Sequence, residues 1–306
     1  MTKGGIIAVE GVFLVLWSSG FIGAKYGLPY AGTFTLLFFR YLILTVVLFG
    51  WLAMSGKLRR IGSSKQIRHA VFIGLLAHFA WLVAVLEATD LGVPPGTVAL
   101  IAALQPMVTG ILAGPVLGER VNVWQWGGLF AGFLGVLLVV GDRVEIDETV
   151  PWWAYAVPLI STISLTLATL YQRSLETRTS EGFLPVINNL AVQCAATTVV
   201  LLPLAAGIEG MEAEWNGEFV FALGWLTFVV SLGAYGMLIF LVKKCPATRV
   251  ASLLYLTPPV TMIMDYLVFG SLVTINGLVG LVIASAGVFL VRLGGFPTKK
   301  AAVGKK

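Results

Sequence analysis

Aromatic and hydrogen-bonding side chains stand in the middle of several long apolar stretches of this sequence. Gln105 directly precedes Pro106 in one stretch, and His78 and Trp81 lie three residues apart in another, so that they share a helix face. Such side chains can stack on a small solute or hydrogen-bond it, and a histidine can also carry a proton near neutral pH. The solute-binding residues expected from this pattern are Trp17, Ser18, His78, Trp81, Gln105, Thr162, Tyr235 and Tyr255.

Each of these residues also has a purely structural interpretation, which the sequence leaves open. Trp17 can be a buried packing residue, and His78 can be a neutral ring that is bonded to a neighbouring helix. A threonine such as Thr162 can bond the backbone of its own helix at little cost in a membrane.

The residues that enzymes use are sparse in the apolar stretches. Intramembrane proteolysis or prenyl transfer needs paired aspartates, a Ser/His dyad or a metal cluster. Asp265 is the only carboxylate well inside a stretch, and His78 has no evident orienting partner. Cys194 and Cys245 form no disulfide framework, and neither a CxxC nor an HExxH motif occurs. We therefore expect no catalytic residue, no metal and no cofactor, and an intramembrane enzyme is the least favoured alternative.

Several charged residues lie near one end of their apolar stretches. Arg40, Glu87 and Asp265 fall in the same third of the membrane, and Lys25 lies at a helix end there. Charges at such depth are costly unless they are paired. We expect Asp265 to form a buried pair with Arg40 or Lys25 that closes a gate, and this group of four is the candidate gating or coupling set.

Composition identifies the solvent of this chain as a membrane. Of the 306 residues, 58% are hydrophobic and only 11% are charged, whereas soluble domains have about 25% charged residues. A helix of about 20 apolar residues spans a bilayer. The sequence predicts an all-α membrane protein with ten spans, at 6–26, 33–54, 70–90, 97–117, 122–141, 152–172, 184–206, 219–242, 250–270 and 275–293.

Positive charges alternate between loops, with Arg143 as almost the only exception. One set of loops is acidic, as at Asp90 and 209–218, and the other set is basic. Because basic loops stay in the cytoplasm, both termini are predicted to be cytoplasmic. The formal charge of +5 is thereby explained without a nucleic-acid partner. The basic set consists of Lys3, Lys57, Arg59, Arg60, Lys65, Arg68, Arg120, Arg173, Arg178, Lys243, Lys244, Arg249, Arg292, Lys299, Lys300, Lys305 and Lys306.

The chain contains an internal repeat. The segment from Val98 to Val140 aligns without a gap to the segment that begins at Val250, and Pro106 then meets Pro258. Five spans per copy is an odd number, so the second copy must have the opposite membrane orientation. Glycine-rich stripes at equivalent places, such as 128–135 and 280–287, are interpreted as packing or dimer surfaces.

The prolines break equivalent spans of the two copies. Pro106 frees the carbonyl of Ala102, and Pro258 and Pro259 free those of Leu254 and Tyr255. Freed backbone groups at mid-depth are tolerated where they line a cavity, and paired breaks of this kind indicate a transport site.

Several segments resemble the EamA-type, ten-helix branch of the drug/metabolite transporter superfamily. They are LWSSGFIGAKYGLP, FFRYLI, ALQPMVTGILAGPVLGERV, QWGGLFAGFLGVLLVV and ASLLYLTPPV. The resemblance implies a central cavity lined mainly by spans 1, 3, 4, 6, 8 and 9, and export of small metabolites, often amino acids. It divides the chain into repeats at 1–145 and 146–296 and a basic cytoplasmic tail at 297–306. Gly270-Ser271 departs from the Gly-Glu that is usual in the second copy.

The sequence therefore predicts a secondary active transporter in the cell (inner) membrane that exports amino acids or related amphipathic compounds by alternating access. Mid-depth aromatic residues suit apolar or aromatic substrate side chains, and the scarcity of cations there disfavours strongly anionic solutes. A facilitative permease, a channel and a membrane scaffold are the alternatives. The expected partners are a small-molecule substrate and the lipid bilayer, and a coupled proton and a second copy of the chain remain open.

Overall fold

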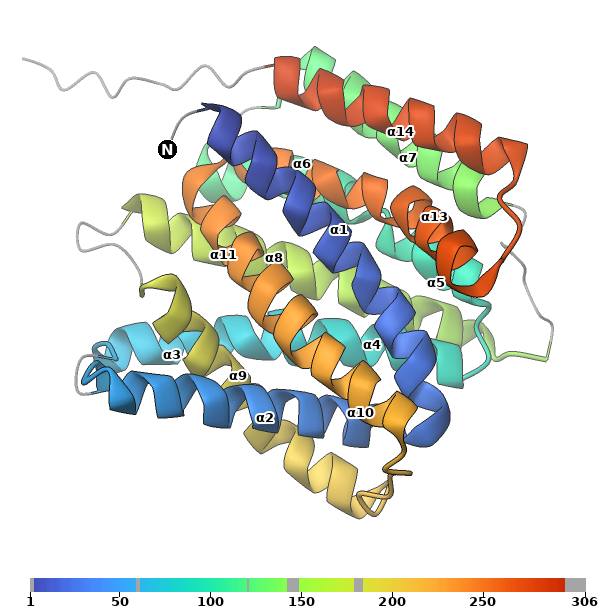
Figure 1. Ribbon diagram of the computed structural model, residues 1–306. Coiled ribbons are helices and arrows are strands. Elements are labelled where there is room, and N and C mark those ends of the chain that lie inside the picture. The colour runs from blue at the N-terminus through green and yellow to red at the C-terminus, as the bar shows by residue number, and fades with distance from the viewer. Residues whose placement is uncertain (1–2, 59–60, 120, 142–148, 179–183, 295–306) are drawn as a thin grey trace, which may run out of the picture.

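The computed structural model describes residues 3–58, 61–119, 121–141, 149–178 and 184–294. Ten helices in these ranges are long and apolar enough to cross a membrane, which confirms the all-α prediction. The predicted basic tail at 297–306 lies outside the described residues. Figure 1 shows the helices as one bundle, with α1 beginning and α14 ending on the same side.

Five spans make up the first half of the chain, and two of them are interrupted. Their elements are α1 (Lys3–Gly27) with a 3-10 turn (Leu28–Tyr30), α2 (Thr33–Met54), α3 (Ser64–Gly74) joined to α4 (Trp81–Asp90) by a π-helical segment (Leu75–Ala80), α5 (Pro95–Ala102) followed by α6 (Gln105–Leu117), and α7 (Val123–Val140).

The second half repeats this arrangement. Its elements are a 3-10 turn (Trp152–Ala156) with α8 (Val157–Arg178), α9 (Val186–Gly207), α10 (Gly217–Gly224) joined to α11 (Tyr235–Lys244) by a π-helical segment (Trp225–Ala234), α12 (Ala247–Ser252) joined to α13 (Thr257–Phe269) by a 3-10 turn (Leu253–Leu256), and α14 (Ile275–Leu293). The π-helical segments and the breaks thus recur in corresponding spans.

Helices extend past the apolar stretches where capping residues allow it. Hydropathy predicts the third span from residue 70, but α3 begins at Ser64. The Ser63 hydroxyl accepts a hydrogen bond from the Gln66 amide, and the Gln66 side chain accepts one from the Ser63 amide. This reciprocal cap starts the helix within the polar loop, so hydropathy alone places the boundary too late.

The two spans that contain proline break at equivalent places. In the first half, α5 ends at Ala102 and α6 begins at Gln105, with Pro106 in its first turn. In the second half, α13 begins at Thr257, with Pro258 at the equivalent position. Proline at the start of a helix removes no backbone hydrogen bond, because the first amides of a helix have no intrahelical partner. Each break therefore leaves a helix amino terminus inside the bundle.

The glycine-rich stripes of α7 and α14 pack against each other, side by side at the upper edge of Figure 1. A Cβ on Gly128 would lie 2.6 Å from the Gly287 carbonyl oxygen, and one on Gly135 would lie 2.7 Å from that of Gly280. The helices are thus antiparallel, and the contacts are reciprocal, since Gly128 and Gly135 are the repeat equivalents of Gly280 and Gly287. Of the packing and dimer roles expected for these stripes, packing within the chain is the one that this structure shows.

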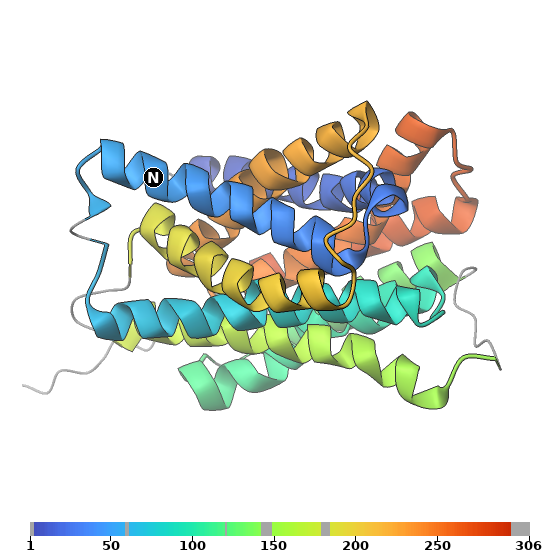
Figure 2. The same cartoon turned by 90° about the horizontal axis from the view of Figure 1, so that it is seen from below.

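The remaining helices surround a partly polar interior. In Figures 1 and 2, α2 lies beside α9, and the two helices pack along much of their length. On the other side of the bundle, α1 packs on the π-helical segment of the eighth span and on α13, while α8 packs on α4 and α6. The elements that meet near the centre are therefore α1, α4, α6, α8 and α13.

Candidate functional site

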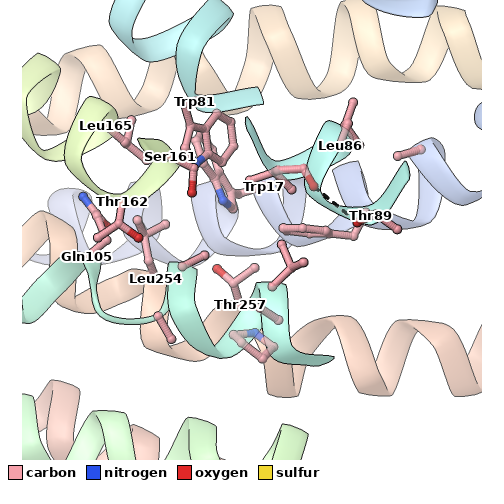
Figure 3. Close-up of a pocket in the computed structure, with 18 of the residues that line it drawn as sticks. Trp17, Trp81, Leu86, Thr89, Gln105, Ser161, Thr162, Leu165, Leu254 and Thr257 are labelled. Carbon is pink, nitrogen blue, oxygen red and sulfur yellow. Dashed lines mark hydrogen bonds between the residues drawn. The ribbon is translucent and has the colours of Figure 1, made fainter. Parts of the chain in front are cut away.

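A cavity of about 380 Å³ lies among these central helices. Its lining comes from α1, α4, α5, the first residue of α6, α8, the 3-10 turn before α13, and the first turn of α13 (Figure 3). Most of the lining is apolar, and it extends to Leu28, Thr89 and Val98, at the ends of helices far from the chain termini. The cavity thus reaches from mid-depth toward the loops on the side opposite the termini.

Two tryptophans form one wall of the cavity. The rings of Trp17 and Trp81 are stacked with centroids 5.1 Å apart, and Tyr235 packs on Trp17 at the same centroid distance. An indole face is a large, flat surface with partial negative charge, and aromatic or aliphatic groups pack well against it. This wall can therefore hold the apolar part of a solute.

Polar atoms at the two broken helices have no partner within the described part of the chain. Gln105 and Thr257 are the first residues of α6 and α13 and line the cavity, and they are 4% and 6% exposed. Among the described residues, neither the Gln105 Oε1 atom nor the Thr257 hydroxyl has a hydrogen-bond partner. A buried polar atom without a partner costs free energy unless a ligand or water satisfies it.

The amino termini of α6 and α13 add a favourable field for a negative group. Each helix has 13 residues, and its dipole places partial positive charge at this end, although Pro106, Pro258 and Pro259 have no N–H and the Thr257 amide already donates to the Leu254 carbonyl. Nearby, the Thr162 hydroxyl donates to the Ile101 carbonyl at 3.1 Å, which ties α8 to α5. Gln105, Thr162 and Thr257 therefore form a polar group that faces the tryptophan wall across the cavity (Figure 3).

His78 lies outside the cavity, one helical turn before Trp81 in the same span. Its Nε2 atom is 2.9 Å from the Gln193 carbonyl oxygen, and its Nδ1 atom is 3.0 Å from the Tyr41 hydroxyl. Since Gln193 also donates to Asn189, its oxygen must accept from the His78 ring. The arrangement is that of a neutral imidazole with both nitrogens satisfied, which matches the structural interpretation.

Three further residues of the predicted binding set also lie outside the cavity lining. Tyr235 is behind the two tryptophans and donates its hydroxyl to the Ala77 carbonyl. Tyr255 is completely buried, and its ring occupies the place where a Cβ on Gly132 would lie. Ser18 is also completely buried. Ser18 and Tyr255 are next in sequence to the lining residues Trp17 and Leu254, but they lie on other sides of their helices.

Lys25 and Asp265 form an ion pair at the rim of the cavity. The Lys25 Nζ atom is 2.8 Å from an Asp265 carboxylate oxygen. Lys25 is therefore the one of the two expected cations that pairs with Asp265, but the pair is not buried as expected, because the Lys25 side chain is 53% exposed. Arg40, the other candidate cation, donates to Ser231 at 2.6 Å instead, and Glu87 is half-buried on α4.

At the opposite end of the bundle, a carboxylate that the sequence prediction leaves without a role joins three helices. Glu10 on α1 is 3% exposed and accepts hydrogen bonds from Arg249 on α12, at 2.8 Å, and from Arg292 at the end of α14. The sequence does contain a signal for it, since a carboxylate stands inside the first span beside a face rich in arginine.

A second group of contacts closes the same end. The Arg173 guanidinium donates to the Lys243 carbonyl at 2.9 Å and pairs with Glu119 at 3.5 Å. Glu119 also accepts from the Ala247 amide, and burial raises the pKa of its carboxyl although both partners act against that shift. Cys245 lies between these groups, and burial likewise raises the pKa of its thiol.

Comparison with known proteins identifies the family of this bundle. The model of the EamA-like transporter family matches residues 4–141 and again residues 152–293. The chain belongs to the EamA-like transporter family. The resemblance noted in the sequence is confirmed, and with ten apolar helices this EamA-like chain is a multi-pass membrane protein.

Relatives of this EamA-like chain are named as transporters. It is 26% identical to an uncharacterized transporter of Archaeoglobus fulgidus, over 90% of this chain and 93% of that protein. It is 21% identical to a probable amino-acid metabolite efflux pump of Escherichia coli, with 94% of both chains covered. It is 24% identical to a probable terminal-alkyne amino-acid exporter of Streptantibioticus cattleyicolor, over 91% of this chain and 90% of that protein.

A protein of known crystal structure has the same fold. It superposes with a TM-score of 0.80 at 15% sequence identity, and the match covers 95% of this chain and 98% of the other. Family and relatives together indicate an exporter of small molecules.

Proposed function

We propose that this protein is a secondary transporter of the cell membrane that exports amino acids with apolar or aromatic side chains through the cavity. The observation that carries the proposal is the pairing of a tryptophan wall with unpartnered polar atoms on Gln105 and Thr257. The naming of two relatives as amino-acid exporters supports it.

The cavity offers a place for each part of such a solute. The carboxylate of the amino acid would lie at the amino termini of α6 and α13. The ammonium group of the same molecule would donate to the Gln105 Oε1 atom. The side chain would lie against Trp17 and Trp81. A volume of about 380 Å³ falls at the small end of ligand pockets, which favours single amino acids over larger metabolites.

Inverted repeats of about residues 1–145 and 146–296 are the architecture that we infer for the transport cycle. The reciprocal, antiparallel contacts between α7 and α14 are those that a two-fold axis between the copies would produce. Contact of Glu10 with Arg292 also places the start of α1 beside the end of α14. With the termini assigned to the cytoplasm by the basic loops, the cavity faces outward and the closed end faces the cytoplasm.

Alternating access would then exchange the two closures. In the outward-facing state, Glu10 and Glu119 hold the cytoplasmic end through Arg249, Arg292 and Arg173. The release of these contacts would open the path from the cytoplasm to Gln105, while closure near Lys25 and Asp265 would seal the outer side. This is the cycle expected of inverted-repeat transporters.

The test is uptake of labelled amino acids into proteoliposomes, with and without a pH gradient. We expect uptake of phenylalanine, leucine or similar solutes, and a rise of about two- to tenfold in KM for Trp81→Ala, which loses an aromatic contact. The matched control is Trp124→Ala, because Trp124 is 67% exposed on α7.

Stimulation by a pH gradient would establish coupling, and equal rates without it would identify a facilitative permease. Transport that is indifferent to Trp81→Ala, or the absence of transport for every amino acid in the panel, would contradict the assignment.

A further inference from the structure

A second hollow lies on the outer surface of the bundle, away from the candidate transport cavity. It has a volume of about 510 Å³ and is bounded by α2, α3, α9 and the residues after α2. Every residue that lines it is apolar, including Phe49, Leu58, Ile67, Val71, Val192 and Val199. We call this hollow the α2–α3–α9 groove.

The α2–α3–α9 groove opens toward the surroundings of the protein and not toward its interior. Val199 is 70% exposed and Leu58 is 40% exposed. Because α2, α3 and α9 belong to membrane spans, the surroundings at Val199 are lipid chains. A groove without polar atoms in this position suits a hydrocarbon chain.

Cations stand at one end of the groove. Lys57 directly precedes the lining residue Leu58, Arg68 directly follows the lining residue Ile67, and Lys65 lies in the first turn of α3, one turn before Arg68. All three side chains are exposed, and within the described part of the chain none of them forms an ion pair. The segment 55–69 contains no acidic residue, so this segment itself supplies no compensating negative charge.

An aromatic contact indicates the depth of this end in the bilayer. The Lys57 Nζ atom lies 4.8 Å from the centroid of the Trp51 ring, and Trp51 is 42% exposed. Tryptophan and lysine at the end of a membrane helix are typical of the headgroup region. The cations therefore lie where phosphate groups lie, and the groove runs from them into the hydrocarbon.

We propose that the α2–α3–α9 groove binds an anionic phospholipid, with one acyl chain in the groove and the phosphate held by Lys57, Lys65 and Arg68. Basic residues at a membrane surface attract anionic lipids by about 1 kcal/mol each. A second copy of the protein fits less well, because a symmetric contact through this surface would bring the same three cations together.

Occupancy would also affect the neighbouring helices. Lipid in the groove contacts both α3 and α9, which pack so closely that a Cβ on Gly74 would lie 2.7 Å from the Gln193 backbone. Bound lipid would therefore stabilise α3, which is the first part of the span that contains Trp81.

The experiment measures thermal stability and native mass spectra of the full-length protein in detergent, after addition of phosphatidylglycerol or phosphatidylcholine. We expect phosphatidylglycerol to raise Tm more and to remain bound in the mass spectrum. The double variant Lys65→Gln/Arg68→Gln should weaken phosphatidylglycerol binding by about 10- to 30-fold. The control Lys244→Gln, an exposed cation on α11 at the same end of the bundle, should leave it unchanged.

A second variant tests the groove without changing charge. Ala195→Phe should fill the space and reduce binding of both lipids, while the protein keeps its elution volume and its Tm without lipid. Equal effects of the two lipids, or full phosphatidylglycerol preference in the double variant, would overturn the proposal. A dimer mass that the Ala195→Phe variant abolishes would assign the groove to a second copy instead, and would overturn it as well.

Discussion

Glu10 provides the sharpest test of how the end that we assign to the cytoplasm is held closed. Its carboxylate accepts from two arginines on separate helices, Arg249 on α12 and Arg292 on α14, and thereby ties both to α1. The variant Glu10→Gln keeps the shape of the side chain and one carbonyl acceptor, but it removes the negative charge. If these contacts exist only while the cytoplasmic end is closed, the variant must favour the open state.

The size of the effect follows from the geometry. A hydrogen bond to a charged group contributes about 1.5–3 kcal/mol. The Glu10 side chain is 3% exposed, whereas those of Arg249 and Arg292 are 26% and 31% exposed, so that water compensates part of the loss on the arginine side. A net change of about 2 kcal/mol corresponds to a shift of about 30-fold toward the inward-open state.

Cys245 is a natural reporter of that shift. It is 2% exposed, lies next to the closing residues just before α12, and has a thiol whose pKa is raised by burial. The thiolate is the species that reacts, so alkylation requires the cytoplasmic end to open. In a Cys194→Ala background, Glu10→Gln should accelerate alkylation of Cys245 by about 30-fold.

Two comparisons distinguish gating from local unfolding. Glu176→Gln removes a carboxylate that pairs with Lys243 at 3.2 Å within the second half of the chain, and it should change the rate little. In a separate variant, Leu28→Cys places a thiol at the outer end of the cavity, where labelling must not rise when Glu10 is changed. Faster labelling at both ends, or an unchanged rate at Cys245, would refute the closure that we assign to Glu10.

Three further predictions concern packing, binding and the rim. Gly135→Leu should lower Tm, because a Cβ there would lie 2.5 Å from the α14 backbone and overpacking lowers the free energy of unfolding by about 1–3 kcal/mol. The control Gly127→Leu should leave Tm unchanged, because nothing lies within 4 Å of a Cβ at that position. Gln105→Leu should raise KM about tenfold without loss of Tm, because the solute then lacks an acceptor. Asp265→Ala should lower the free energy of unfolding by at most about 1 kcal/mol and should also lower the transport rate. The double variant in which Lys25 and Asp265 are exchanged should restore that rate. A wild-type transport rate in Asp265→Ala alone would exclude a gating role.

Much of this architecture follows from the spacing of residues along the chain. The apolar runs predict ten spans, and the alignment of Pro106 with Pro258 is enough to locate both helix breaks. The same alignment contains a further residue that the predicted binding set omits. Thr257 is the repeat equivalent of Gln105, lines the same cavity and has an unpartnered hydroxyl, so a search of both copies at each candidate position would have found it.

Rotation about the helix axis is what the sequence does not reveal. In a span that is apolar on all sides, hydrophobic periodicity gives little information on which face meets the cavity. His78 and Trp81 both contact Tyr235, yet only Trp81 reaches the cavity. The ring of His78 is satisfied by Tyr41 and Gln193, on helices distant in sequence, and a single sequence does not show that these three side chains meet.

The two copies agree where they contact each other and differ where the two ends close. Glycines are retained at the reciprocal contact of α7 and α14, because any Cβ there would collide. At the turns after α6 and α13, Glu119 binds Arg173 and the α12 backbone, whereas its equivalent Ser271 carries no charge. The outer end has the half-exposed pair of Lys25 with Asp265 instead. Because Lys25 and Asp265 already pair while the cavity reaches the outer side, their pair does not oppose this arrangement, whereas the buried charged hydrogen bonds of Glu10 stabilise it. We therefore expect the protein without substrate to rest with its cytoplasmic end closed.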